Sequence, residues 1–162
     1  MTDLLTHVLV AFVAATVLSW VAGPVTKRHV PLAMVGAVLP DTAKAYLLLG
    51  SIRPSVLGVE VSWLALQTLG GSLALAGVVT LFVDRAERRP AAALLGLGVG
   101  LHVLLDYLVV RAGGYAPPYL YPFTWAQLPA GNVYLSSDIW PGALAVAVAG
   151  VVVIVDRHLS DQ

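Results

Sequence analysis

Long apolar runs separated by short polar breaks dominate the pattern along the chain. Each run has about the 20 residues that an α-helix needs to cross the hydrocarbon core of a bilayer. The pattern therefore predicts an all-α integral membrane protein, folded as one domain over residues 1–162, with a bundle of about five transmembrane helices. The expected spans are residues 4–23, 30–50, 62–83, 91–111 and 139–155.

The second expected span contains a proline followed by an acidic residue. Pro40 lacks a backbone N–H group and disfavours helical backbone at Leu39, so we expect this helix to break at Pro40. Asp41 comes next. A carboxylate beside freed backbone groups at membrane depth is tolerated only where it faces protein or a wet cavity. From the sequence, this segment either crosses the membrane fully or re-enters on the same side.

The fourth expected span carries two ionisable residues, His102 and Asp106. Positions i and i+4 share one face of a helix, so the imidazole and the carboxylate point the same way. An ionisable group in hydrocarbon costs roughly 2.5–3.5 kcal/mol on insertion scales, so we expect both to face other helices. In the same span, Gly96 and Gly100 form a Gly-x-x-x-Gly pattern, which predicts close helix packing within the bundle.

The connection at residues 112–138 is rich in proline and in tyrosine, phenylalanine and tryptophan. Tyrosine and tryptophan favour the headgroup level of a membrane. We therefore expect an interfacial loop that lies on the membrane surface, with a substrate lid as the alternative.

Composition agrees with a membrane protein and narrows the possible partners. The chain is 59% hydrophobic and only 11% charged, with a mean hydropathy of +0.86. Its net charge of zero gives no attraction for nucleic acid, so membrane lipids are the expected partners. The absence of cysteine excludes disulfides and thiolate metal sites. The first apolar run lacks the basic segment of a cleaved signal peptide, so we expect it to be retained.

The distribution of basic residues predicts the orientation in the cell membrane. Cytoplasmic loops of membrane proteins carry an excess of lysine and arginine. With five crossings, the N-terminus outside and the C-terminus in the cytoplasm, the outer segments hold Arg53 and Arg111. The inner loops then hold Lys27, Arg28, Arg85, Arg88, Arg89 and Arg157.

In that orientation, polar residues from all five spans fall in the outer half of the bundle: His7, Asp41, Gln67, His102, Asp106 and Asp138. Two histidines with two or three carboxylates at one depth can bind Zn or Mn and leave positions open for water. A spare carboxylate can act as a general base or orient a ligand. The alternative is a hydrogen-bonded network without metal. The remaining ionisable groups of the inner side are expected to be solvated: His29, His158, Asp84, Glu87, Asp156 and Asp161.

Three short motifs carry a resemblance to a known family. Thr6-His7, Leu39-Pro40-Asp41 and the segment from Leu101 to Asp106 resemble the pattern of the YdjM-type membrane-bound, metal-dependent hydrolases, over residues 6 to about 125. The resemblance implies a helical bundle with a His/Asp metal centre, distantly similar in pattern to that of zinc-dependent phospholipases. It implies hydrolysis of a phosphoester or a similar bond. By position it implies that the metal-site residues are His7, Asp41, His102 and Asp106, with Asp41 and Asp106 as the catalytic carboxylates.

One segment departs from the family pattern. The family has an HR-x-x-TH block at the start of its third helix, whereas this chain has the segment 66–72 with Gln67. A neutral amide binds Zn or Mn weakly, so the departure predicts a weaker or mononuclear site, or the loss of the site.

Three functions therefore follow as hypotheses. The first is a membrane metal-dependent hydrolase, with its active site open to the outer leaflet and a lipid or phosphoester as substrate. The second is a transporter or proton relay, because carriers also use intramembrane Asp and His beside a broken helix. The third is a non-catalytic membrane scaffold that has lost a ligand at Gln67.

Overall fold

The computed structural model describes residues 4–45, 47, 55–56, 58–60 and 62–160. Within them the fold is helical, which confirms the predicted all-α membrane class. The α-helices are α1 (Leu4–Val21), α2 (Val30–Val38), α4 (Leu69–Leu81), α5 (Arg88–Tyr107) and α6 (Trp140–Ser160). Short 3-10 helices occur at η1 (Lys27–His29), η2 (Leu39–Ala45) and η3 (Trp63–Gln67). Two-residue strands β1 (Ser55–Val56) and β2 (Val59–Glu60) pair in an antiparallel hairpin.

Helix length separates the expected spans into two groups. Among the described residues, three helices could cross a membrane by length and apolar composition: α1, α5 and α6. They correspond to the first, fourth and fifth expected spans. The expected spans 30–50 and 62–83 instead hold shorter α-helices, α2 with 9 residues and α4 with 13. α2 runs directly into η2, whereas the extended residue Thr68 separates η3 from α4. The end of the expected second span and Arg53 lie outside the described residues.

The predicted break at Pro40 coincides with the change from α2 to η2. The α-helix ends at Val38, and the Leu39 N–H group still reaches the carbonyls of Gly36 and Val35. Pro40 can donate no such bond, so the chain continues in the tighter 3-10 form. As a result, Asp41 lies in η2 and not in α2.

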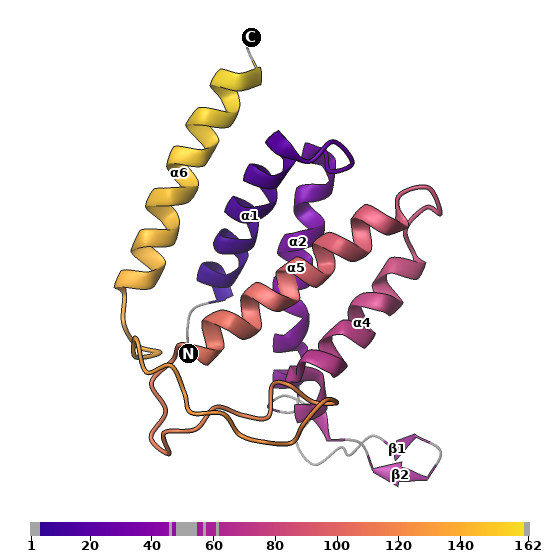
Figure 1. Cartoon of the computed structure of the whole chain (residues 1–162), viewed down its shortest axis with the longest axis vertical. Helices are drawn as coiled ribbons and strands as arrows, with labels where there is room; N and C mark the ends of the chain where they lie inside the picture. Colours follow the sequence, from indigo (N-terminus) through magenta and orange to yellow (C-terminus); the bar gives the residue numbers. More distant parts are fainter. Residues whose placement is uncertain (1–3, 46, 48–54, 57, 61, 161–162) are drawn as a thin grey trace.

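The bundle is built around the crossing of α2 and α5, with α1 and α4 beside them and α6 next to α1 (Figure 1). A Cβ atom on Gly36 would lie 2.2 Å from the Leu95 carbonyl oxygen, and one on Gly98 would lie 2.1 Å from that of Ala33. Only glycine at both positions permits this approach. The Gly-x-x-x-Gly prediction was therefore wrong in its residues, because the space beside Gly100 is open.

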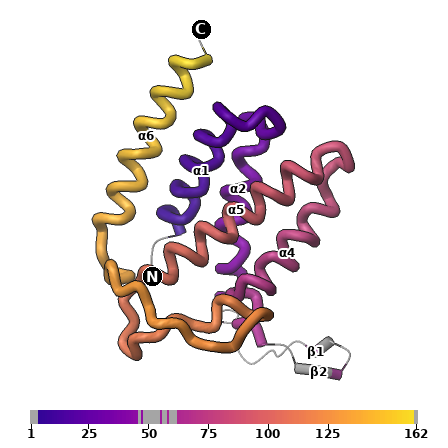
Figure 2. Tube along the Cα trace, viewed as in Figure 1, coloured from indigo at the N-terminus to yellow at the C-terminus, as the bar shows by residue number. Residues whose placement is uncertain are grey.

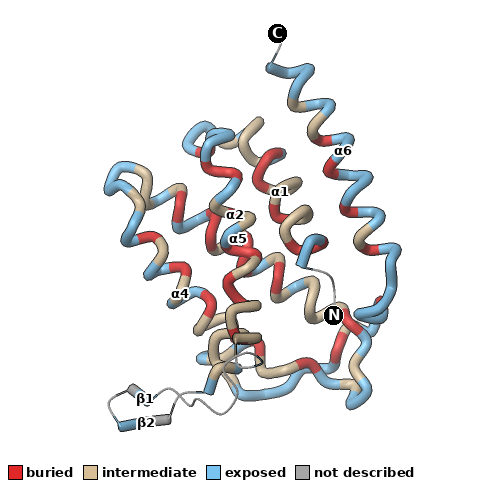
Figure 3. The backbone as a smooth tube through the Cα atoms, turned by 180° about the vertical axis from the view of Figure 1, so that it is seen from behind, coloured by how far each residue is buried: buried red, intermediate tan, exposed pale blue. Residues whose placement is uncertain are grey.

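The buried side chains follow the inner faces of α1, α2 and α5, whereas α6 exposes most of its surface (Figure 3). The central cluster consists largely of small residues, which allow the helices to pack closely: Ala11, Ala15, Ala33, Ala37 and Leu94 with Val25 and Val30. The exposed apolar face of α6 suits contact with lipid chains.

The segment between α5 and α6 runs across the ends of the helices (Figure 2). It is tied to α4 by backbone hydrogen bonds from Leu69 N to the Tyr119 carbonyl (2.7 Å) and from Gly70 N to the Tyr121 carbonyl (2.8 Å). Tyr119 is buried, while Phe123 is 82% exposed. The segment therefore has one side held against the bundle and another that exposes aromatic residues. This arrangement suits the interfacial role predicted for it.

Candidate metal centre

Two buried histidines from different helices meet near one end of the bundle. His7 lies in the first turns of α1 and His102 lies in α5, and each is 1% exposed. Their rings stack with centroids 4.1 Å apart and an interplanar angle of 28°. The fold thus brings together these two residues, which lie 95 positions apart in the chain, as expected from the sequence.

The Asp106 carboxylate lies between the two imidazoles. Its Oδ1 is 3.3 Å from His7 Nε2, and its Oδ2 is 3.6 Å from His102 Nε2. The i,i+4 spacing on α5 places Asp106 and His102 on one face, as predicted, and α1 supplies His7 from the other side. One ligand atom from each of the three residues lies within 4.8 Å of the others.

A backbone hydrogen bond fixes the tautomer that His102 adopts. Its Nδ1–H donates to the carbonyl oxygen of Ala37, in α2, at 2.7 Å. In the neutral ring Nε2 then carries a lone pair. Among the described residues this buried Nε2 atom has no hydrogen-bond partner. Histidine ligands in metal sites are held in the same way, since they donate the N–H of the non-ligating nitrogen to a backbone carbonyl or a carboxylate.

Asp41 approaches the same nitrogen from η2. Its Oδ1 is 3.6 Å from His102 Nε2, but it is also 2.5 Å from the Lys44 ammonium nitrogen. Lys44 was not among the predicted site residues, although its i,i+3 spacing from Asp41 could have indicated the pair. Asp41 therefore borders the His7, His102 and Asp106 group with its charge already balanced.

Two other residues expected at this depth do not join the group. Asp138 is exposed and accepts a hydrogen bond from the backbone of Leu135, so it stabilises the turn before α6. Gln67 ends η3 and lines a separate cavity with Thr68 and Trp125. Both expectations relied on depth alone, which does not determine the direction of a side chain.

Tyr119 and Arg111 stand beside the group and were missed in the sequence. One Arg111 Nη2 atom donates to the Tyr119 hydroxyl (2.9 Å) and to the Asp106 carbonyl oxygen (3.3 Å). Burial raises the pKa of Tyr119 well above its usual value, and the negative charge of Asp106 raises it further. The phenol therefore stays protonated at physiological pH. No local pattern links position 119 to α5; only the return of the loop does.

Two distances between donor atoms agree with those expected around a divalent metal. Nitrogen and oxygen ligands about 2.0–2.2 Å from a tetrahedral Zn lie about 3.3–3.6 Å from one another. The distances from Asp106 Oδ1 to His7 Nε2, 3.3 Å, and from Asp106 Oδ2 to His102 Nε2, 3.6 Å, fall in that range, each through a different oxygen of the carboxylate. Two imidazoles and a carboxylate form a donor set suited to Zn and Mn, and the open fourth position would admit water.

A second histidine–carboxylate cluster lies at the opposite end of α2 and α5. His29 was expected to be solvated, but it is 4% exposed, and its Nε2 is 2.6 Å from Glu87 Oε2. Its Nδ1 accepts from the Thr26 backbone N–H at 3.1 Å. Glu87, also expected to be solvated, binds Arg28 as well. The prediction failed because η1 folds back onto the start of α5.

Asp156 corrects the same expectation on α6. Its Oδ1 accepts a hydrogen bond from Trp20 Nε1 (2.9 Å) and lies 2.8 Å from the Lys27 ammonium nitrogen. The carboxylate thus joins the ends of α1 and α6 instead of being a free solvated group.

Comparison with known proteins gives one match. A family model described as YdjM inner membrane protein matches residues 1–159. No curated protein and no solved structure matches the chain.

Proposed function

The chain belongs to the YdjM inner membrane protein family, and from this premise we propose that it is a membrane hydrolase that uses a divalent metal. Zn is the first choice and Mn the second, with His7, His102 and Asp106 as ligands. Gln67 does not weaken this ligand set, because it lines a separate cavity. The substrate is a lipid or another phosphoester reached from the membrane.

The arrangement around His102 Nε2 carries the proposal. The Nδ1 proton of this ring is used by Ala37, so Nε2 presents a lone pair. The nearest charged atoms are oxygens of Asp41 and Asp106, each 3.6 Å away, and these are acceptors too. Acceptors that face one another in a buried site repel. Lys44 already pairs with Asp41. The repulsion that a further cation would relieve is therefore the one between Asp106 and His102. A metal bound between them would satisfy both.

The bound metal would supply Lewis acidity, which activates water and polarises an ester oxygen at neutral pH. The chain's own residues would do the rest. Asp41, held by Lys44, can orient a water beside the donor group and accept its proton. The protonated Tyr119 hydroxyl can donate a hydrogen bond to an oxygen of the substrate. Ala37 keeps the His102 ring in its ligating tautomer.

Metal analysis of the detergent-purified protein tests the proposal. After exposure to Zn and removal of the excess, the wild type should retain about one metal per chain, as a mononuclear site predicts. His102→Ala should retain almost none. The control is His158→Ala, since His158 is exposed in the last turn of α6 and should leave the metal content unchanged.

The same preparations then test catalysis. A chromogenic phosphodiester and vesicles of phosphatidylglycerol serve as probes, with phosphate and lipid products measured. Wild-type hydrolysis that disappears with a chelator and in His102→Ala supports the proposal. A metal-free wild type that behaves identically to His102→Ala would overturn it.

A second candidate, proton relay, is favoured by one observation. Ionisable groups form a continuous row from Lys44 through Asp41, His102 and Asp106 to His7, with successive distances of 2.5, 3.6, 3.6 and 3.3 Å. Such rows carry protons in pumps and transporters. Proton flux into vesicles that contain the protein, abolished by Asp41→Asn without any bound metal, would favour this function over hydrolysis.

A further inference from the structure

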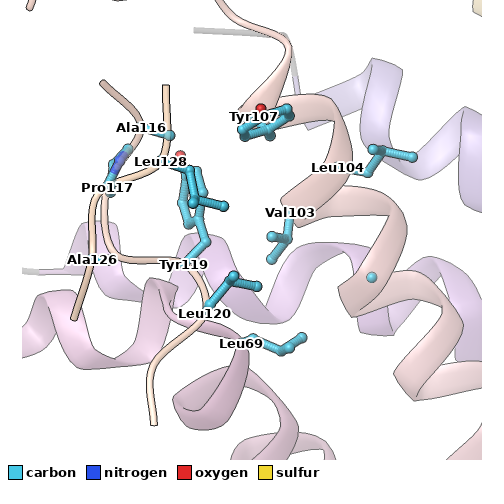
Figure 4. Close-up of a pocket in the computed structure, with 11 residues that line it drawn as sticks. Leu69, Val103, Leu104, Tyr107, Ala116, Pro117, Tyr119, Leu120, Ala126 and Leu128 are labelled. Carbon is cyan, nitrogen blue, oxygen red and sulfur yellow. The ribbon is translucent and has the colours of Figure 1, made fainter. Parts of the chain in front are cut away.

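An apolar cavity of about 350 Å³ lies next to the candidate metal centre. α5 forms one wall, the loop at residues 116–128 forms the other, and the first residue of α4 closes the end (Figure 4). The lining is apolar apart from two tyrosines, and Val103, Leu120 and Leu128 supply much of it. At the small end of the range of about 300–1,000 Å³ for ligand pockets, it has room for one slender apolar group.

The cavity and the metal centre share their wall. Val103 and Tyr107 line the cavity and directly follow His102 and Asp106 in α5. Tyr119 also lines the cavity, and Figure 4 shows its ring between the loop and α5. Its hydroxyl accepts from Arg111 beside Asp106. A molecule in the cavity would thus be apolar along its length and would meet polar groups only at the Tyr119 end.

The surroundings of the cavity identify the occupant. Its rim includes Leu104, Leu120 and Leu128, which are 53%, 37% and 40% exposed. Leu104 lies in α5, a helix with the length and composition of a membrane span, and Leu120 and Leu128 lie on the loop opposite it. The medium next to such a helix is hydrocarbon, so the abundant slender apolar groups at the rim are lipid acyl chains.

We propose that this cavity binds an acyl chain of a membrane lipid, with the ester or phosphate group of that lipid at the Tyr119 and Arg111 end. The proposal deepens the proposed function: it makes the substrate a lipid taken from the bilayer and not a water-soluble phosphoester. Acyl-chain binding itself requires no metal and no turnover, so it can be tested separately from hydrolysis.

Gly100 offers a way to fill the cavity without disturbing the fold. It lines the cavity on α5, and a Cβ atom there would meet nothing within 4 Å. Gly100→Phe should therefore place its ring in the space of the chain. The matched control is Gly150→Phe on α6, because Gly150 is exposed, helical and equally free of neighbours but far along the sequence from the cavity.

The probe is phosphatidylglycerol with a diazirine in one acyl chain, mixed into phosphatidylcholine vesicles that contain the protein with chelator present. After illumination, labelled peptides are mapped by mass spectrometry. We expect saturable labelling of 103–107 and 119–128, reduced roughly tenfold in Gly100→Phe because the ring takes the place of the chain. Labelling of α6 should stay unchanged, and Gly150→Phe should label 103–107 and 119–128 like the wild type.

Labelling of 103–107 and 119–128 that does not saturate, or that is equal in Gly100→Phe and wild type, would overturn the proposal. Both variants must elute as the wild type does from size-exclusion chromatography. Because the protein is metal-free here, failure of the hydrolase proposal leaves this result intact. Conversely, a metal-dependent hydrolase without saturable labelling would act on a soluble phosphoester.

Discussion

Two buried histidines, His29 and His102, lie at opposite ends of the α2–α5 pair and have different environments. Both nitrogens of His29 are engaged, one by the Thr26 backbone N–H and one by Glu87. His102 has one nitrogen bound to the Ala37 carbonyl, while the other faces two carboxylates at 3.6 Å. Both rings are therefore buried, and within the described part of the chain they differ in whether the second ring nitrogen has a hydrogen-bond partner.

The charges around the two rings differ in the same way. Glu87 binds Arg28 as well as His29, so the cluster at this end satisfies its own carboxylate. Asp106 binds no lysine or arginine through its side chain among the ion pairs of the described residues. A closed network stabilises the fold by itself, whereas an open one needs a further cation. We infer that the His29 cluster is structural and the His102 cluster binds a ligand.

The largest expected effect is an increase in stability on metal binding, which should require the His102 cluster and not the His29 cluster. A metal that binds only the folded state stabilises it by about 2.7 kcal/mol at 100 times its Kd and by about 4.1 kcal/mol at 1,000 times. Added Zn should therefore raise the midpoint of thermal unfolding of the wild type in detergent, and His7→Ala should abolish the shift. Glu87→Gln should keep it.

An equal Zn-induced shift in wild type and His7→Ala would contradict this assignment. If Glu87→Gln abolished the shift instead, the His29 cluster would be the metal site and the His102 cluster the structural one. Mg at the same concentration is the control for general ionic effects, because imidazole ligands suit Zn and not Mg.

The next largest effect is expected when the carboxylate beside each histidine is removed, with chelator present to keep the protein free of metal. Glu87→Ala leaves the buried His29 Nε2 without its acceptor and should lower the free energy of unfolding by about 1–3 kcal/mol. Asp106→Asn removes a negative charge that faces the His102 Nε2 lone pair at 3.6 Å, and the new amide can donate to that nitrogen. It should be close to neutral or stabilising in the metal-free protein. Denaturant unfolding followed by tryptophan fluorescence measures both; equal losses would contradict the distinction.

Local pattern was enough to predict part of the centre. The i,i+4 spacing of His102 and Asp106 and the break at Pro40 are properties of a short segment, and both appear in the structure. The meeting with His7 followed from depth in the membrane. Depth also suggested Asp138 wrongly, because it fixes a level along the bundle but no direction around the helix.

The errors concern partners that are distant in sequence. His29 finds Glu87 58 residues away, and Gly36 faces the α5 backbone next to Gly98 because two helices cross there. No segment of the chain contains that information. Thr26 and His29 form a capping box in the structure, but the sequence signature of that motif has Glu or Gln where this chain has His29, so it did not indicate the fold of this turn.

The smallest expected effect comes from the exposed ion pair between Lys27 and Asp156, which lies at the same end of the bundle as His29. Lys27 and Asp156 form an ion pair whose side chains are 53% and 24% exposed, so it should contribute less than about 1 kcal/mol. Asp156→Asn removes this charge pair but keeps an oxygen that can accept from Trp20. The unfolding midpoint should shift only slightly, and less at high salt, because salt screens exposed charges. A large, salt-insensitive loss would instead mean that the hydrogen bond between α1 and α6 depends on the carboxylate, and Trp20→Phe should then reproduce that loss.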